Sequence, residues 1–168
     1  MWLFGQKQRE ILKKETKHFI RTLGTILFIL YVFLLIYFLF FFEKYGRASA
    51  SQGEYRYNLI PFMEIQRFWK YRDKLGKYAV HANLLGNVIG FLPWGFILPV
   101  IKDRMRSGCL VILSGFMLSF TVESIQLVTK TGCFDVDDII LNTLGAAFGY
   151  LLFVICNHLR RKKYGKKI

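Results

Sequence analysis

One stretch of the sequence, Leu23–Phe42, runs for 20 residues without a charged side chain. An α-helix rises 1.5 Å per residue, so about 20 apolar residues span the roughly 30 Å hydrocarbon core of a bilayer. Three further apolar blocks follow, and nearly all of the charge lies between the blocks. A soluble domain of this length would spread its apolar residues over one core. The pattern therefore excludes a soluble globular enzyme and a disordered basic chain, and it predicts a small polytopic membrane protein.

The expected fold is all-α, a four-helix transmembrane bundle. The spans are expected at about residues 23–42, 84–101, 109–128 and 139–157. Because proline removes a helical hydrogen bond, we expect Pro93 to interrupt the second span, and we expect Pro99 and the basic turn Lys102–Arg106 to end it. The predicted parts of the chain are a basic cytoplasmic arm, a membrane domain and a basic cytoplasmic tail, at residues 1–22, 23–157 and 158–168.

The distribution of lysine and arginine predicts the orientation. Fifteen of the 24 lie in the N-terminal arm, the turn after the second span and the tail, and nine lie in the two loops on the opposite side. Short cytoplasmic segments are rich in these residues, so we expect a multi-pass protein of the cell membrane with N-in/C-in topology. The net charge of +13 is then explained by basic residues that fix the topology and contact lipid headgroups. No nucleic-acid partner is expected. Ala48-Ser49-Ala50 resembles a cleavage site, but the apolar block before it is longer than a signal peptide requires, so we expect no cleavage.

The loop between the first and second spans, about residues 43–82, combines charge with aromatic side chains. Its middle reads Asn58-Leu59-Ile60-Pro61-Phe62, and Phe68-Trp69-Lys70-Tyr71 follows. Aromatic rings favour headgroup depth, and lysine ammonium groups favour water. We therefore expect an amphipathic extracytoplasmic segment that lies at the membrane interface.

Several acids and amides lie at one depth in the predicted bundle. Such side chains are costly inside a bilayer and usually face a bundle interior or a water-filled cavity. Pairs three or four residues apart share a helix face. The residues lie at the outer start of the second span, the outer end of the third and the outer start of the fourth: Asn83, Asn87, Glu123, Gln126, Asp135, Asp137, Asp138 and Asn142. If Asp135 starts the fourth helix, Asp135, Asp138 and Asn142 form a polar stripe on one face of it. We expect the bundle to hold an acidic, amide-lined pocket that opens outward.

Each of these features also has a structural explanation without a ligand. The amides would serve as interhelical hydrogen-bond partners, and Glu123 would be a buried structural acid. A helix cap would explain Asp135 or Asp137 but not Glu123. Two glycine pairs, Gly86 with Gly90 and Gly145 with Gly149, predict close helix packing. The three cysteines predict no disulfide framework.

Four motifs in the chain resemble those of the VanZ-like family, in the same order and at the same spacing. They are Asn58-Leu59-Ile60-Pro61-Phe62, Gly86-Asn87-Val88-Ile89-Gly90-Phe91-Leu92-Pro93-Trp94-Gly95-Phe96, Glu123-Ser124-Ile125-Gln126, and the segment from Phe134 through Asp135, Val136, Asp137 and Asp138 to Asn142 and Gly145. The founding member of this family is associated with resistance to the glycopeptide antibiotic teicoplanin, and relatives are widespread in Gram-positive bacteria. The resemblance therefore implies an envelope protein with a role in glycopeptide resistance.

The resemblance also implies which residues form the site. The family's motif residues fall on Asn58, Pro61, Asn87, Pro93, Glu123, Gln126, Asp135, Asp138 and Asn142. Many relatives carry an arginine just before the Phe-Asp pair, whereas this chain has Thr131-Gly132-Cys133 there. Lys130 is then the nearest cation, so a role in binding an anionic group would be weaker here or would fall to Lys130.

Three functions are compatible with these residues. The first is a non-enzymatic envelope protein that lowers the access or binding of a lipophilic glycopeptide at the membrane, with membrane lipids as partners. The second is an intramembrane enzyme that acts on a lipid-linked cell-wall precursor, with Glu123 as general acid or base and with Asp135 and Asp138 as ligands of a divalent cation such as Mg²⁺. Asn87, Gln126 and Asn142 would then orient the substrate. The third is a membrane scaffold or small transporter, and the absence of an inverted repeat argues against transport.

Overall fold

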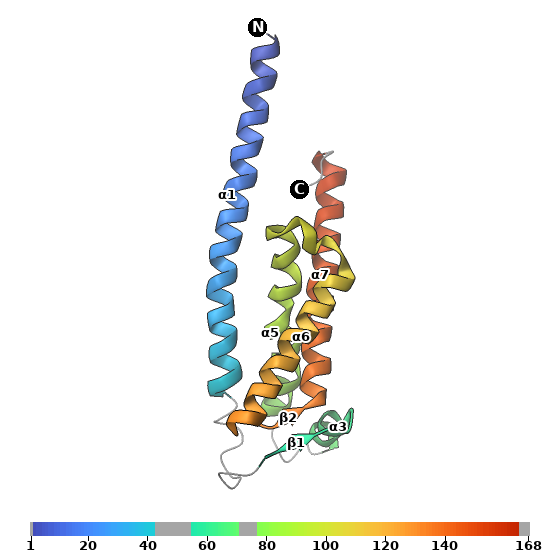
Figure 1. Cartoon of the computed structure of the whole chain (residues 1–168). Helices are drawn as coiled ribbons and strands as arrows, with labels where there is room; N and C mark the ends of the chain where they lie inside the picture. The colour runs from blue at the N-terminus through green and yellow to red at the C-terminus, as the bar shows by residue number, and fades with distance from the viewer. Residues whose placement is uncertain (1, 43–54, 71–76, 165–168) are drawn as a thin grey trace.

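The computed structural model describes residues 2–42, 55–70 and 77–164, so Ala48-Ser49-Ala50 lies outside the described residues. These residues are almost entirely helical, with one short pair of strands (Figure 1). The elements in chain order are α1 (Trp2–Tyr37), the π-helix η1 (Phe38–Phe42), β1 (Tyr57–Asn58), α3 (Met63–Lys70), α5 (Lys77–Ile101), the 3₁₀ turn η2 (Asp103–Arg106), α6 (Gly108–Thr129), β2 (Phe134–Asp135) and α7 (Val136–Tyr164). The basic N-terminal arm is thus helical and continuous with the first span.

Four of these helices are long and apolar enough to cross a membrane. Their membrane-crossing segments are His18–Phe40, Leu84–Ile101, Gly108–Thr129 and Val136–Lys163. Large apolar side chains remain exposed along all four of them, as expected where lipid replaces water as the surrounding medium. The predicted all-α bundle of four membrane-crossing helices is confirmed.

The helices α5, α6 and α7 form the packed core of the bundle, and α1 lies beside α5 (Figure 1). The N-terminal end of α1, the turn η2 and the C-terminal end of α7 lie toward one end of the molecule, and β1, β2 and α3 lie at the other. Phe91 of α5, Val111 of α6 and Ala146 of α7 are fully buried between these helices. This arrangement leaves one end of the bundle to the short elements that hold the site.

Glycines allow α5 and α7 to approach closely. A Cβ atom on Gly145 would lie 2.2 Å from the carbonyl oxygen of Val88, and one on Gly149 would lie 2.0 Å from that of Leu92. The predicted packing role of this α7 pair is confirmed. The expectation fails at Gly86: a Cβ there would meet nothing within 4 Å among the described residues.

Another glycine of α5 takes the role that was expected of Gly86 and Gly90. A Cβ on Gly90 would make an ordinary contact with Leu35 of α1, at 3.7 Å. A Cβ on Gly95 would lie 1.9 Å from the carbonyl oxygen of Ala146 in α7. The reason is the rotation of α5 about its axis, which turns Gly95 toward α7.

Pro93 does not interrupt α5, contrary to the prediction, whereas the helix ends at Ile101, directly before the basic turn, as predicted. The helix runs through Pro93 and Pro99 to Ile101. Neighbouring groups can satisfy the backbone that a proline disturbs inside a membrane bundle. The Tyr31 hydroxyl of α1 donates to the carbonyl oxygen of Gly90 at 2.7 Å, three residues before Pro93. This contact joins α1 to α5 one residue after Ile89, whose carbonyl oxygen lacks a helical donor because Pro93 has no N–H group.

Candidate functional site

Two short strands tie the first loop to the junction between α6 and α7. They pair in parallel, with Tyr57 opposite Phe134 and Asn58 opposite Asp135. The backbone N–H of Phe134 also donates to the carbonyl oxygen of Arg56 at 3.0 Å. Asp135 therefore belongs to β2 and does not start the fourth helix, which begins at Val136. The pairing places the Asn58 motif directly against the aspartate motif, 77 positions further along the chain.

Polar side chains gather at this end of the bundle and bond mainly to one another and to the backbone. We call this group the polar cluster: Asn58, Asn87, Ser119, Glu123, Asp135, Asp137, Asp138 and Asn142. Three of its four acids are deeply buried, with exposed fractions of 2% for Glu123 and 1% for both Asp135 and Asp137, and Asp138 is partly buried. A buried carboxylate is tolerated only where hydrogen-bond donors or charges compensate its lost hydration. The donors around each acid therefore decide what the cluster can do.

Asp135 is the centre of the polar cluster. Its Oδ1 accepts hydrogen bonds from Asn58 Nδ2 at 3.2 Å and from the backbone N–H of Asp137 at 2.9 Å. Its own backbone N–H donates to Glu123 Oε2 at 3.0 Å. One residue thus joins the first loop, α6 and the start of α7.

Asp137 caps a helix that is distant in sequence. Its carboxylate accepts the backbone N–H groups of Phe62, Glu64 and Ile65, at 2.8 Å for Glu64 and 3.2 Å for Ile65. These are the free N–H groups at the start of α3, and a carboxylate there is stabilised by both hydrogen bonding and the helix dipole. Asp137 therefore fastens α3 to the first turn of α7.

Two further side-chain pairs join the core helices. Asn87 Nδ2 of α5 donates to Asp138 Oδ1 of α7 at 2.6 Å. One turn further along α7, Asn142 Nδ2 donates to Ser119 Oγ of α6 at 2.9 Å. Asn142 is 1% exposed and Ser119 is fully buried. These contacts extend the polar cluster from the end of the bundle into its interior.

Three predicted site residues lie outside the polar cluster. Gln126 is buried, and its Nε2 donates at 2.8 Å to the carbonyl oxygen of Leu39 in η1, so it binds the end of α1. Lys130 ends α6 in a left-handed conformation with φ 56°, and its Nζ lies 4.6 Å from the centre of the Tyr55 ring. Pro61 is exposed in the turn before α3. The side chain of Asn83 lies outside the described residues.

The turn that holds Pro61 is strained at the following residue. Phe62 has φ 66°, a region that bulky side chains rarely adopt. Proline followed by a residue of positive φ is the pattern of a type II turn, in which glycine usually takes the second place. The N–H of Phe62 bonds to Asp137, so the same carboxylate that caps α3 also holds this conformation.

One member of the polar cluster, Ser119, is absent from the sequence prediction. Ser119 lies four residues before Glu123, so the shared helix face could have indicated it. Asp137 is expected among the acids at this depth, but no local pattern links it to Glu64 and Ile65. Its role depends on the loop folding back onto α7.

The expected outward-opening pocket and the expected metal site stay predictions. The hollow at this end of α6 is apolar and is lined by Phe120, Thr121, Ser124, Ile125, Val128 and Thr129, none of them a predicted site residue. Among the described residues no group of three His, Cys, Asp or Glu side chains is placed to hold a metal ion. Asp135 Oδ1 and Asp138 Oδ1 accept amide N–H groups of Asn58 and Asn87. Mg²⁺ requires oxygen ligands, so these two contacts do not fit a magnesium site. We therefore assign no step to a metal.

Comparison with known proteins places the chain in a family. The family model described as VanZ/LLP1 matches residues 28–157. The chain is also 30% identical to Protein VanZ of Enterococcus faecium over 142 residues, which cover 83% of this chain and 79% of that protein. No solved structure matches the chain.

Proposed function

The chain belongs to the VanZ/LLP1 family, and from this membership we propose that it lowers the sensitivity of a bacterial cell to teicoplanin-type glycopeptides. The proposed site is the end of the bundle that carries the polar cluster. The observation that carries the proposal is the bonding of Asp135 and Asp137, which holds the motif-bearing first loop against α6 and α7. The family motifs thus meet in one place, although they are scattered along the chain.

We further propose that the polar cluster faces the outside of the cell membrane. In this N-in/C-in orientation, the end with the N-terminal arm, η2 and the C-terminal tail holds fifteen lysines and arginines and lies in the cytoplasm. The first loop and α3 then lie at the outer surface, where a glycopeptide acts.

In the proposed mechanism the polar cluster holds an apolar surface at the outer membrane face. Leu59, Ile60, Phe62 and Trp69 are each more than half exposed on and beside α3. Such side chains insert at the headgroup boundary, which is also where a lipophilic glycopeptide must insert. A protein that occupies and orders this boundary lowers the local binding of the drug without any chemical step.

The alternative of an intramembrane enzyme places Glu123 and Asp138 in catalysis. Ser119 and Glu123, one turn apart on α6, offer a hydroxyl and a carboxylate on the same helix face. Both are buried, at 0% and 2% exposure, so a lipid-linked precursor would reach them only after the bundle opened. Because these side chains are buried, the structure favours the non-enzymatic role, in which the polar cluster holds the apolar surface in place. An assay for turnover of lipid-linked wall precursors distinguishes the two functions.

The test compares the wild type with Glu123→Gln and Asp138→Asn in a susceptible Gram-positive host. Both substitutions remove a charge but keep the shape and an acceptor oxygen. We expect protection against teicoplanin to fall to the level of the empty vector, because each substitution weakens a charge-assisted hydrogen bond of the polar cluster, from the Asp135 N–H to Glu123 or from Asn87 to Asp138. The measurement is the minimum inhibitory concentration, at equal protein levels in the membrane fraction.

Glu15→Gln is the matched control. Glu15 is exposed on α1, outside the polar cluster, so the same loss of charge should leave protection unchanged. The proposal is contradicted if Glu123→Gln and Asp138→Asn protect as well as the wild type. Loss of protection together with loss of precursor turnover would instead favour the enzyme.

A further inference from the structure

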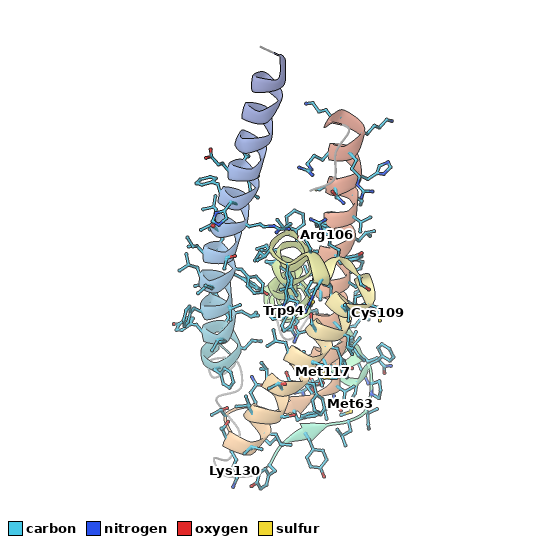
Figure 2. The ribbon with its side chains drawn as sticks, turned by 45° about the horizontal axis from the view of Figure 1, so that its top comes forward. Met63, Trp94, Arg106, Cys109, Met117 and Lys130 are labelled. Carbon is cyan, nitrogen blue, oxygen red and sulfur yellow. The ribbon has the colours of Figure 1, made fainter. Side chains whose placement is uncertain are left out.

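A second group of charged side chains lies at the end of the bundle opposite the polar cluster. Figure 2 shows Arg106 toward this end, far from Met63 and Lys130. The carboxylate of Asp103 lies between two guanidinium groups. Arg21 Nη2 of α1 donates to Asp103 Oδ2, and Arg106 Nη2 lies 2.9 Å from Asp103 Oδ1. Two segments distant in sequence, α1 and η2, therefore meet around one acid.

The two arginines have more donors than Asp103 can accept. Each guanidinium carries an Nε–H and an Nη2–H on one edge, a fork that matches two oxygens of a carboxylate or phosphate. The Nε atoms of Arg21 and Arg106 are both buried and have no hydrogen-bond acceptor within the described part of the chain. Arg106 Nη2 is close to Asp103 but is not aligned for a hydrogen bond. On each arginine, the edge formed by Nε–H and Nη2–H therefore has at least one donor without an acceptor among the described residues.

The surroundings of this group are basic and held in place. The turn from Lys102 to Arg106 contains three basic side chains and one acid, and Lys102 and Arg104 are exposed. The Tyr150 hydroxyl of α7 donates to the carbonyl oxygen of Arg106 at 2.7 Å, which anchors the turn on the core. An anion would therefore meet a fixed site with an excess of positive charge.

The depth of the group matches that of lipid phosphates. Arg21 lies three residues inside the start of the membrane-crossing segment His18–Phe40, and η2 joins the ends of the second and third such segments. The side chains of Arg21 and Arg106 remain 31% and 29% exposed. Basic groups at this boundary attract anionic headgroups.

We propose that Arg21 and Arg106 form a binding site for the phosphate of an anionic phospholipid. The lipid phosphate takes the place of the Asp103 carboxylate and supplies oxygens to both fork edges, including the two Nε–H groups that Asp103 does not reach. Asp103 is the internal counter-ion that competes with the lipid. The site is separate from the polar cluster and independent of the proposed function.

The test measures lipid retained by the purified full-length protein. The protein is exchanged into detergent with phosphatidylglycerol or phosphatidylcholine, and bound lipid is counted by native mass spectrometry. We expect selective retention of phosphatidylglycerol by the wild type and a roughly tenfold loss of affinity in Arg21→Gln/Arg106→Gln, since charge-assisted hydrogen bonds are lost. The control Arg104→Gln/Lys162→Gln removes two exposed charges and should retain the lipid.

Asp103→Asn separates lipid binding from a folding defect. It keeps both arginines and removes their competitor, so retention of phosphatidylglycerol should rise above that of the wild type. A fall in retention for this variant, equal losses in both double variants, or full retention in Arg21→Gln/Arg106→Gln would overturn the proposal. Displacement of the lipid by millimolar inorganic phosphate would also overturn it, because the site would then bind a free ion.

Discussion

Asp137 bonds to the backbone of a helix that is distant in the chain, and Glu64 of that helix lies 73 residues before it. Its two oxygens accept three backbone N–H groups at the start of α3, and its own N–H donates to Asp135. A helix of 8 residues is too short to be stable alone, so its position depends on such contacts. The residue therefore links the buried acids to the exposed surface of the first loop.

Replacing Asp137 with asparagine should loosen α3. The amide keeps one acceptor oxygen and turns an NH₂ group toward backbone N–H donors, and losing such a cap costs about 1–2 kcal/mol. We expect roughly tenfold faster hydrogen exchange at Phe62, Glu64 and Ile65, since 1.4 kcal/mol corresponds to a factor of ten. Mass spectrometry of peptides that cover these residues measures it.

The control for this variant lies in the same helix. Glu64 forms an ion pair with Arg67 at 2.9 Å at the surface, and such a pair contributes little to stability. Glu64→Gln should therefore leave exchange nearly unchanged. Equal protection in Asp137→Asn and in the wild type would mean that other contacts hold α3.

At the scale of elements, the backbones of α5 and α7 are in direct contact, whereas α1 is held to the other helices by side-chain contacts. Gly145 and Gly149 place α7 directly on the backbone of α5. In the most apolar stretch of α1, only 6% of the residues are buried inside the structure, compared with 33% in the corresponding stretch of α7. Polar contacts hold α1 at three levels instead, through Arg21, Tyr31 and the carbonyl oxygen of Leu39. Interhelical hydrogen bonds in membranes contribute about 0.6–2 kcal/mol each, so α1 is the helix most easily displaced.

A single methyl group should separate α5 from α7. The Cβ of Gly149→Ala would lie 2.0 Å from the carbonyl oxygen of Leu92 and 3.0 Å from the Cα of Gly95, and backbone atoms cannot rotate away. We expect a loss of about 1–3 kcal/mol in stability, as is usual for overpacking. The measurement is thermal unfolding in detergent, followed by size-exclusion chromatography.

Gly86→Ala provides the comparison, because a Cβ at this position would meet nothing within 4 Å in the described part of the chain. Alanine also favours a helix over glycine by about 1 kcal/mol, so this variant should be as stable as the wild type or more so. If Gly149→Ala and Gly86→Ala unfold at the same temperature, α5 and α7 are packed less tightly than the glycine contacts indicate.

At the scale of the whole molecule, two chemically different ends are separated by the apolar length of the bundle. One end carries buried acids and amides, and the other carries the Arg21–Asp103–Arg106 group. Which end faces outward can be tested with the native cysteines. Cys133 lies beside β2 at the cluster end, and Cys109 is exposed at the start of α6 near the basic end.

A thiol reagent that does not cross membranes should label Cys133 in intact cells. The variant Cys109→Ser/Cys156→Ser, which keeps only Cys133, should react from outside, because the proposed orientation places the turn before β2 there. The variant that keeps only Cys109 should react only after permeabilisation. The reverse pattern would invert the proposed topology.

The number of membrane helices and their approximate bounds follow from the sequence alone. The length of an apolar run and the charges that flank it are local properties, and a bilayer acts on them directly. The same logic placed Asn87, Glu123 and Asp138 at one depth, because rise along a helix is fixed. Depth is thus readable from the chain before any contact is known.

Only the tertiary structure decided which partners meet at that depth. The rotation of each helix about its axis brought Gly95 rather than Gly86 against α7, and brought Ser119 to Asn142. The return of the first loop gave Asp137 its three N–H donors. In a membrane, the pattern of apolar residues does not determine how each helix is rotated about its axis, because lipid and protein neighbours are equally apolar. Close packing and hydrogen-bond partners determine this rotation instead.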